Sequence, residues 1–269
     1  MRVTKDELKE GRFVVPYRVY GNAHQVLVCV SGAQQTMAVW LSVVRYFTPD
    51  YTVVIFDLPG QGRSRTLSGP PGASLEEQVA VLDRVISVTR NNGQINLAAA
   101  SWGTVVAASY AAQHPGASDK LILASFGLKP SDALLEVIKD GQKLVDTNNG
   151  QRLGHLIIER FGQDIPDTYK HRIIEQFSNM GTDQLMAFYA HSESVENARH
   201  LSDFIDLHKI EAKTLIINGE NDAILDLGDA ASAAERIPNC QFRVLPGVGH
   251  FLHFECEDIL DIYKEFLAC

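Results

Sequence analysis

Three residue types that together perform nucleophilic catalysis occur in the order serine, acid, histidine, each just after an apolar segment of strand length. They are Ser101, Asp222 and His250. In such a set the histidine takes the proton of the serine hydroxyl, and the acid holds the imidazole tautomer and stabilises its positive form. This order and placement is what a serine nucleophile needs on a parallel sheet. We therefore predict that Ser101, Asp222 and His250 form a catalytic triad.

The serine lies at a bend between a predicted strand and a predicted helix. The apolar run Ile95–Ala100 leads into Ser101-Trp102-Gly103, and Thr104–Gln113 has a helical pattern. Such a turn projects the hydroxyl above the sheet edge, and the helix directs free backbone N–H groups towards a developing negative charge. The usual consensus is G-x-S-x-G, and Ala99 stands at its first glycine. On this stretch alone, Ser101 could equally cap a core helix, with the glycine needed only for packing.

Two aspartates are candidates for the acid of the triad. Asp222 ends the apolar segment 214–222, and Asp226 lies four residues later. Backbone geometry is best defined at a strand end, whereas an aspartate just before Leu227 could as easily cap the next helix. The histidine follows a glycine turn, and taken alone such a histidine is more often structural. The agreement of three independent placements supports the triad as a whole. Because Asp222 lies closer to the strand end, we predict that Asp222 rather than Asp226 orients His250.

A loop of small residues is predicted to complete the site. The apolar run Gln25–Val30 leads into Ser31-Gly32-Ala33-Gln34, after which a helical stretch begins. In a sheet of this kind the loop lies beside the serine turn, so the backbone N–H of Ala33 would join that of Trp102 to hold an oxyanion. Gly32 lets the backbone come close. The alternative is a tight strand-to-helix turn without a catalytic role.

The remaining core segments alternate between strand and helix patterns, which predicts a mostly parallel sheet flanked by helices on both faces. Ser74 and Glu77 have the spacing of a capping box at the start of a helix that runs to about Asn91. A further helix is expected at about Thr36–Tyr46. The strand patterns are Phe13–Tyr20, Gln25–Val30, Thr52–Phe56, Ile95–Ala100, Lys120–Phe126, 214–222 and Cys240–Leu245.

The alternation stops at Pro130, and for some 75 residues only helical patterns follow. We therefore predict a core of residues 1–129 and 206–269 and a helical cap of residues 130–205. Insertions at the carboxyl edge of a parallel sheet commonly cover the ligand crevice. The many apolar side chains of this cap could line a pocket for an acyl chain. The alternative is an all-α second domain with no part in the chemistry.

Composition restricts the partners. The 269 residues are 45% hydrophobic and 21% charged, which is ordinary for a globular chain with a large core. The net charge is −9 without a basic block, so nucleic acid and anionic membrane surfaces are poor candidates. Residues 1–20 lack the apolar region of a secretory signal, and no stretch reads as a membrane span. A cytoplasmic protein that acts on small molecules is expected.

Neither a metal nor a cofactor is expected. The four cysteines, Cys29, Cys240, Cys256 and Cys269, show no C-x-x-C spacing and predict neither a zinc site nor a disulfide framework. Gly60-Gln61-Gly62 lacks the third glycine and the helix of a dinucleotide-binding turn. His253 and Asp258 spell an acyltransferase pattern, H-x-x-x-x-D. We discount it because a five-residue offset in a helix does not place two side chains on one face.

The motifs resemble those of a known superfamily. Ser101-Trp102-Gly103, Asn218-Gly219-Glu220-Asn221-Asp222 and Gly247-Val248-Gly249-His250 are similar to the α/β-hydrolase motifs. Within that superfamily, Ala-Ser-Trp-Gly at the elbow, the segment 56–65 and Gly249-His250-Phe251-Leu252 with Glu255 resemble two groups. These are the hydroxyalkanoyloxy-alkanoate synthases of rhamnolipid biosynthesis and the related hydroxyacyl carrier-protein transacylases. Ser31 departs from the asparagine that the subfamily tends to have in its loop.

This resemblance implies an α/β-hydrolase fold in which the same three residues act as the triad. The implied substrates are 3-hydroxyacyl thioesters on an acyl carrier protein or coenzyme A, with one acyl chain passed to the hydroxyl of another. An esterase, thioesterase or lactone hydrolase would use the same residues with water as acceptor. A non-catalytic binding module on this fold is the third alternative, because fold does not imply function.

Overall fold

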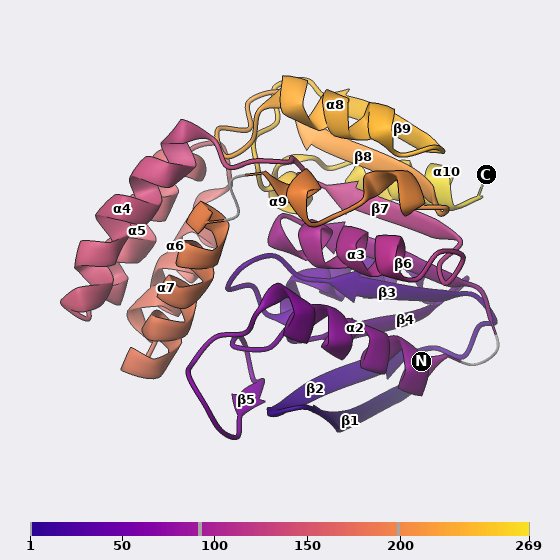
Figure 1. Cartoon of the computed structure of the whole chain (residues 1–269), viewed down its shortest axis with the longest axis horizontal. Helices are drawn as coiled ribbons and strands as arrows, with labels where there is room; N and C mark the ends of the chain where they lie inside the picture. The colour runs from indigo at the N-terminus through magenta and orange to yellow at the C-terminus, as the bar shows by residue number, and fades with distance from the viewer. Residues whose placement is uncertain (1, 91–92, 198–199, 269) are drawn as a thin grey trace.

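One sheet organises the chain (Figure 1). Within residues 2–90, 93–197 and 200–268, which the computed structural model describes, nine strands pair in the order β1-β2-β4-β3-β6-β7-β8-β9, with β5 beside β2. The pairs from β4 through β9 are parallel, whereas β2 pairs antiparallel with each of its neighbours. The predicted mostly parallel sheet is therefore confirmed. The strands are β1 (Val3–Glu10), β2 (Phe13–Tyr20), β3 (Val26–Val30), β4 (Thr52–Phe56), β5 (Arg65–Thr66), β6 (Ile95–Ala100), β7 (Lys120–Ala124), β8 (Lys213–Gly219) and β9 (Cys240–Leu245).

Helices cover both faces of the sheet, which explains why the central strands are apolar throughout. Successive side chains of a strand point to opposite faces, and in β3, β4 and β6 every residue is buried. One face packs against α2, α3 and α8, and the other against α1, α9 and α10. The helices are α1 (Leu41–Phe47), α2 (Leu75–Thr89), α3 (Trp102–Gln113), α4 (Asp132–Asp146), α5 (Gly150–Phe161), α6 (Asp167–Ser178), α7 (Thr182–Asn197), α8 (Leu227–Arg236), α9 (Leu252–Glu255) and α10 (Ile259–Ala268).

Several predicted boundaries move for local reasons. Strand β7 ends at Ala124 rather than at the predicted Phe126 because Ser125 has a φ of 58°, which turns the chain. The helix expected from Thr36 begins as a 3₁₀ turn, η1 (Met37–Trp40), before α1. Both bonds of the capping box that begins α2 are present. Asn91 and Cys269 lie outside the described residues.

Strand β1 was not expected from the sequence. Its side chains are mostly exposed at the sheet edge, so the apolar alternation that would predict a strand is missing. Its backbone pairs in full register with β2, from Val3 opposite Tyr20 to Glu10 opposite Phe13. Edge strands of this kind are held by backbone pairing rather than by a buried face.

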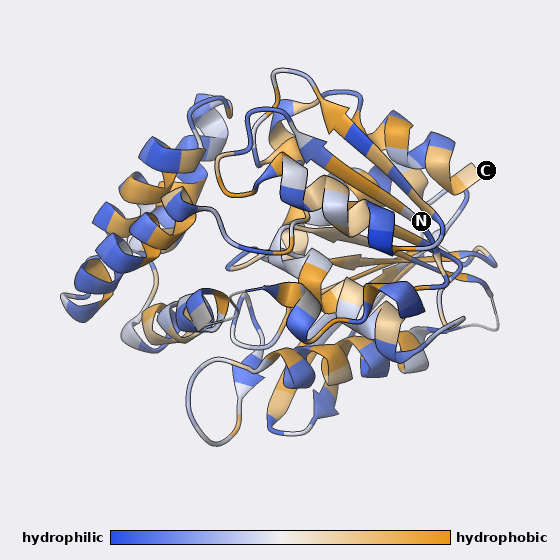
Figure 2. Cartoon of the chain, turned by 45° about the horizontal axis from the view of Figure 1, so that its top comes forward, coloured by the Kyte–Doolittle hydropathy of each residue, from blue (hydrophilic) through white to orange (hydrophobic). Residues whose placement is uncertain are grey.

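The helices α4 to α7 stand together beside the carboxyl ends of the strands, between β7 and β8 in the chain (Figure 1). They pack on one another through a separate small core of Val145, Leu153, Phe177 and Leu185. Their surfaces alternate between polar and apolar stripes (Figure 2). These four helices occupy the region predicted to be the cap, although the exact domain boundaries stay a prediction.

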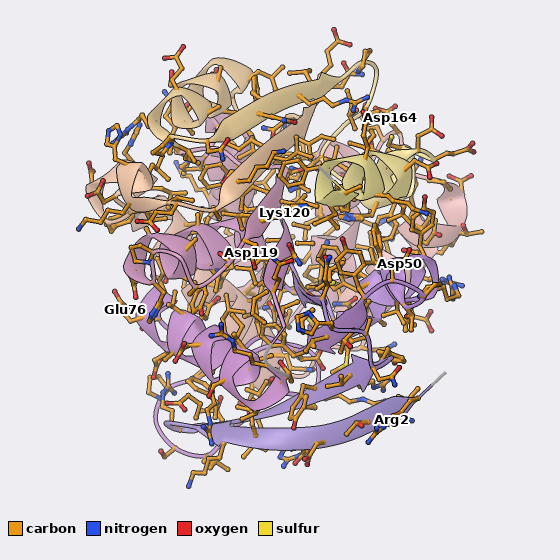
Figure 3. All side chains as sticks on the ribbon, turned by 90° about the vertical axis from the view of Figure 1, so that its right-hand side faces the viewer. Arg2, Asp50, Glu76, Asp119, Lys120 and Asp164 are labelled. Carbon is orange, nitrogen blue, oxygen red and sulfur yellow. The ribbon has the colours of Figure 1, made fainter. Side chains whose placement is uncertain are left out.

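Figure 3 shows the molecule from the side on which the parallel strands begin. Asp50 precedes β4 there, and Asp119 and Lys120 lie at the start of β7.

No helix in the described part of the chain is long and apolar enough to cross a membrane. The same residues contain no cluster of three or more potential metal-binding side chains. Cys29, Cys240 and Cys256 are free thiols.

Candidate active site

Ser101 occupies a strained turn between β6 and α3. Its φ is 51°, a value that residues other than glycine rarely adopt. The backbone N–H of Ser101 donates to the carbonyl of Ala124 at 2.9 Å, which anchors the turn to β7. Although Ser101 stands at the N-cap position, its side chain does not cap the helix. The alternative that this serine is a helix cap is therefore wrong.

Glycine is required at position 103 because the helix passes very close to the end of β3. A Cβ at Gly103 would lie 2.4 Å from the carbonyl oxygen of Val30 and 2.6 Å from that of Ser31. At the first consensus position, Ala99 is fully buried within β6, where a methyl group is accommodated. Packing thus explains the second glycine of the consensus and tolerates the loss of the first.

The structure brings the three predicted triad residues together. His250 Nε2 lies 2.8 Å from Ser101 Oγ, and His250 Nδ1 lies 2.8 Å from Asp222 Oδ2. The second oxygen, Asp222 Oδ1, accepts hydrogen bonds from the backbone of Ile224 at 2.8 Å and Leu225 at 3.2 Å. Both Asp222 and His250 are buried. This arrangement lets the histidine take the hydroxyl proton while the carboxylate holds its other nitrogen.

Asp226 has a different task. Its side chain accepts a hydrogen bond from the backbone N–H of Asp229 at 2.8 Å and so caps α8. The structure therefore places Asp222, and not Asp226, beside His250. The discounted pair His253 and Asp258 is split between α9 and the turn before α10, so these residues do not share one helix.

Two further side chains, those of Glu255 and Ser125, hold the backbone around His250, and neither was predicted as a site residue. Glu255 accepts hydrogen bonds from the backbone N–H of Gly249 and of Phe251, on either side of the histidine. Ser125 Oγ donates to the carbonyl of His250 at 2.8 Å. The signal for Glu255 was its place five residues after His250 within the resembling motif. Ser125 left no signal, because only the tertiary structure brings β7 to this loop.

The oxyanion loop is braced by a side chain from another loop. Gln61 accepts from the backbone N–H of Gln34 at 2.7 Å and donates to the carbonyl of Gly32 at 3.0 Å. Ala33 lies between these two anchors. Its N–H and that of Trp102 donate to no group within the described residues, and both residues line the same cavity. Two free donors beside the serine are what an oxyanion hole requires.

The loop that carries Gln61 is itself held by a buried carboxylate. Asp57 accepts hydrogen bonds from the backbone of Met37 at 2.6 Å and of Arg63 at 2.9 Å. Burial raises the pKa of Asp57, and these two backbone donors oppose that shift. The turn-rich loop after β4 therefore has a structural role in supporting the loop 31–34.

A cavity of about 620 Å³ opens above the serine. Ser101 and His250 line it together with apolar side chains from all four inserted helices. This volume lies within the usual range for small-molecule sites, which are mostly apolar with a few polar groups. Among its apolar lining residues are Val137, Ile138, Leu153, Ile157, Ile173, Phe177, Phe188 and Val195.

Two other histidines line this cavity, but both are uncharged at neutral pH. Burial lowers the pKa of His191 and of His253 to about 4. The ring of His191 packs edge-to-face against Trp102, with centroids 4.3 Å apart. Since neither contacts the serine hydroxyl, His250 is the residue placed to act as its base.

The sequence as a whole now identifies the family. Residues 21–257 match the profile of the family described as serine aminopeptidase S33. The chain belongs to this family. It is an enzyme of the α/β-hydrolase fold.

Members and relatives of this fold differ in activity. The chain is 25% identical to an (R)-3-hydroxydecanoyl-ACP:CoA transacylase of Pseudomonas aeruginosa, over 91% of this chain and 82% of that protein. It is 24% identical to a poly(3-hydroxyalkanoate) depolymerase of Ectopseudomonas oleovorans, over 90% and 83%. Among solved structures, the α/β hydrolase MGS-M2 from a Medee basin deep-sea metagenome library superimposes with a TM-score of 0.85 at 20% identity, covering 98% of each chain.

The different contacts of the two aspartates lead to a testable difference. Replacing Asp222 by Asn should lower turnover by roughly 10⁴-fold, because the amide would favour the wrong imidazole tautomer. The matched change Asp226→Asn alters only a helix cap, and turnover should stay near that of the wild type. Steady-state kinetics on both variants measure this. A mild Asp222→Asn effect together with a severe Asp226→Asn effect would show that the acid is misassigned.

Burial of His191 predicts an acid-sensitive stability. The pKa of His191 is about 4 in the folded protein against its ordinary value of 6.5, so between these pH values the unfolded chain binds more protons. The resulting contribution, up to roughly 3 kcal/mol, is present above pH 6.5 and is lost as the pH falls towards 4. The variant His191→Phe keeps a ring against Trp102. Its melting temperature should fall less steeply from pH 6.5 to 4.5 than that of the wild type, and parallel curves would contradict the assignment.

Proposed function

We propose that this enzyme transfers a 3-hydroxyacyl group from a thioester to the hydroxyl of a second 3-hydroxyacyl chain, through an acyl-enzyme on Ser101. The observation that carries the proposal is a hydrogen-bonded Ser101, His250 and Asp222 set at the wall of a large apolar cavity. The product, two hydroxyacyl chains joined by an ester, corresponds to the lipid moiety of rhamnolipids. The relatives that act on 3-hydroxydecanoyl-ACP support this substrate class.

In the first step Ser101 Oγ attacks the thioester carbonyl while its proton passes to His250 Nε2. The developing oxyanion is stabilised by the N–H groups of Ala33 and Trp102, and Asp222 stabilises the imidazolium. The tetrahedral intermediate then breaks its C–S bond, and the carrier leaves as a thiol that takes the proton from His250. A Ser101 ester and the free carrier remain.

In the second step the hydroxyl of another hydroxyacyl chain attacks the Ser101 ester. His250 takes the hydroxyl proton and returns it to Ser101 Oγ as the new ester leaves. Transfer requires that the acceptor hydroxyl reach the acyl-enzyme before water does. The apolar faces of α4 to α7 support this requirement, because they bind the acceptor chain and exclude water. We therefore propose that these helices act as a cap.

Water as the acceptor is the second candidate. The same triad would then make the enzyme an esterase, thioesterase or lactone hydrolase. The likeness to a poly(3-hydroxyalkanoate) depolymerase favours this candidate. Because the first step is common to both, only the identity of the product separates them.

Product analysis tests the proposal. Purified enzyme with 3-hydroxydecanoyl-CoA or the matching carrier-protein thioester should yield an ester dimer, identified by mass. The variant Ser101→Ala should fold, form no acyl adduct in intact-mass spectra and lose roughly 10⁴- to 10⁶-fold in rate. An adduct on Ser101→Ala would refute the nucleophile. Wild-type protein that yields only free hydroxy acid at every acceptor concentration would instead establish the hydrolase.

The cap can be tested with neighbouring isoleucines of α5. Ile157 lines the cavity and Ile158 does not, although both are half-buried. The change Ile157→Gln should admit water and shift the product from ester dimer towards free acid by several-fold, because a polar side chain hydrates the acyl site. The control Ile158→Gln should keep the wild-type product ratio. Equal ratios for the two variants would show that the apolar wall does not direct the acyl group.

A further inference from the structure

The charged side chains that line the cavity all have the same sign. Arg45, Lys129 and Arg172 belong to its wall, and no aspartate or glutamate of the described residues does. The chain as a whole has the opposite balance, with 33 acidic and 24 basic residues. A wall that concentrates positive charge in an acidic protein favours an anionic ligand.

None of these three cations has an ion-pair partner within the described chain. The guanidinium groups of Arg45 and Arg172 make no salt bridge there, although both side chains are exposed. By contrast, Arg12, Arg65 and Arg152 each lie within 3.0 Å of a glutamate. The donors of Arg45 and Arg172 are therefore free for an anion, and the planar guanidinium suits a phosphate.

Both arginines stand on a wall that starts at the oxyanion loop. Gln176 of α6 donates to the carbonyl of Gln34, so this helix contacts the catalytic site directly. Arg172 is one turn before Gln176 on the same helix. Arg45 is one turn beyond Ser42 in α1, and both of these residues also line the cavity. Arg45 of α1 and Arg172 of α6 therefore belong to the wall of the cavity that Ser101 also lines.

Aromatic side chains close this wall next to Arg172. Its guanidinium carbon lies 5.8 Å from the ring centroid of Tyr169. That ring in turn stacks on Phe254, with centroids 4.5 Å apart. Tyr169 and Phe254 both line the cavity, so Arg172 is supported by rings while its charge stays exposed.

We propose that Arg45 and Arg172 bind the phosphate that joins the pantetheine arm of the thioester carrier to the rest of the carrier. This subsite rests on the proposed function, because it assumes that a thioester presents its carbonyl to Ser101. The acyl chain occupies the apolar part of the cavity, and the arm leaves along the wall of α1 and α6. Coenzyme A and acyl carrier protein share this phosphate, so one subsite serves either carrier.

The test compares thioesters with and without the phosphate. Arg45→Gln and Arg172→Gln should each raise KM for 3-hydroxydecanoyl-4′-phosphopantetheine and for the CoA thioester by about 10- to 100-fold. The N-acetylcysteamine thioester has no phosphate, and its kinetics should not change. The control Arg84→Gln removes the same charge from an exposed site of α2 that does not line the cavity, and it should leave every KM unchanged.

The outcomes separate the subsite from the proposed function. An equal loss on the N-acetylcysteamine thioester, or a loss on the CoA thioester alone, would overturn the pantetheine phosphate site. Binding of free 4′-phosphopantetheine by calorimetry needs no turnover, and it should weaken in both variants. Wild-type protein that turns over no thioester yet binds this ligand through the arginines would refute only the function. Unchanged binding in the variants would refute the subsite.

Discussion

The close approach of α3 to the end of β3 determines the geometry of the site. With no side chain at Gly103, the helix comes so near that even a methyl group would meet the carbonyl oxygens of Val30 and Ser31. This contact holds the turn at Ser101 in its positive φ, which the residue would not adopt in isolation. It also brings the N–H of Trp102 beside the loop that follows β3. One packing contact therefore sets both the nucleophile and the donors that face it.

The rest of the triad depends on loops that hold one another. Asn221 donates to the carbonyl of Val248 at 2.8 Å, which ties the turn after β8 to the turn after β9. A Cβ at Gly219 would lie 2.2 Å from the carbonyl oxygen of Gly249, so these turns meet without room for a side chain. Glu255 fixes the backbone around His250. Preorganisation of this kind keeps the imidazole in line with both of its partners and costs no rearrangement during the reaction.

The four inserted helices supply what the core cannot. The core strands end in polar loops, whereas α4 to α7 add apolar surface above them and contribute apolar side chains to the cavity wall. The contact between Gln176 and Gln34 joins this layer to the oxyanion loop. The sequence relatives include a transacylase and a depolymerase, so the shared fold does not by itself fix the reaction.

The sequence by itself determined the fold class and predicted Ser101, Asp222 and His250 as the triad, because each of these conclusions depends on a local pattern. Buried strands are apolar runs, the elbow has a glycine two residues after its serine, and Asp222 and His250 follow strand ends. Strand β1 was not predicted because its side chains are mostly exposed, so it lacks an apolar pattern and is held by backbone pairing with β2. Only the tertiary structure decided that Gln61 braces the loop at Ala33, that Ser125 holds the carbonyl of His250, and that Ile157 rather than Ile158 faces the cavity. These facts depend on contacts between segments far apart in the chain, which no local pattern records.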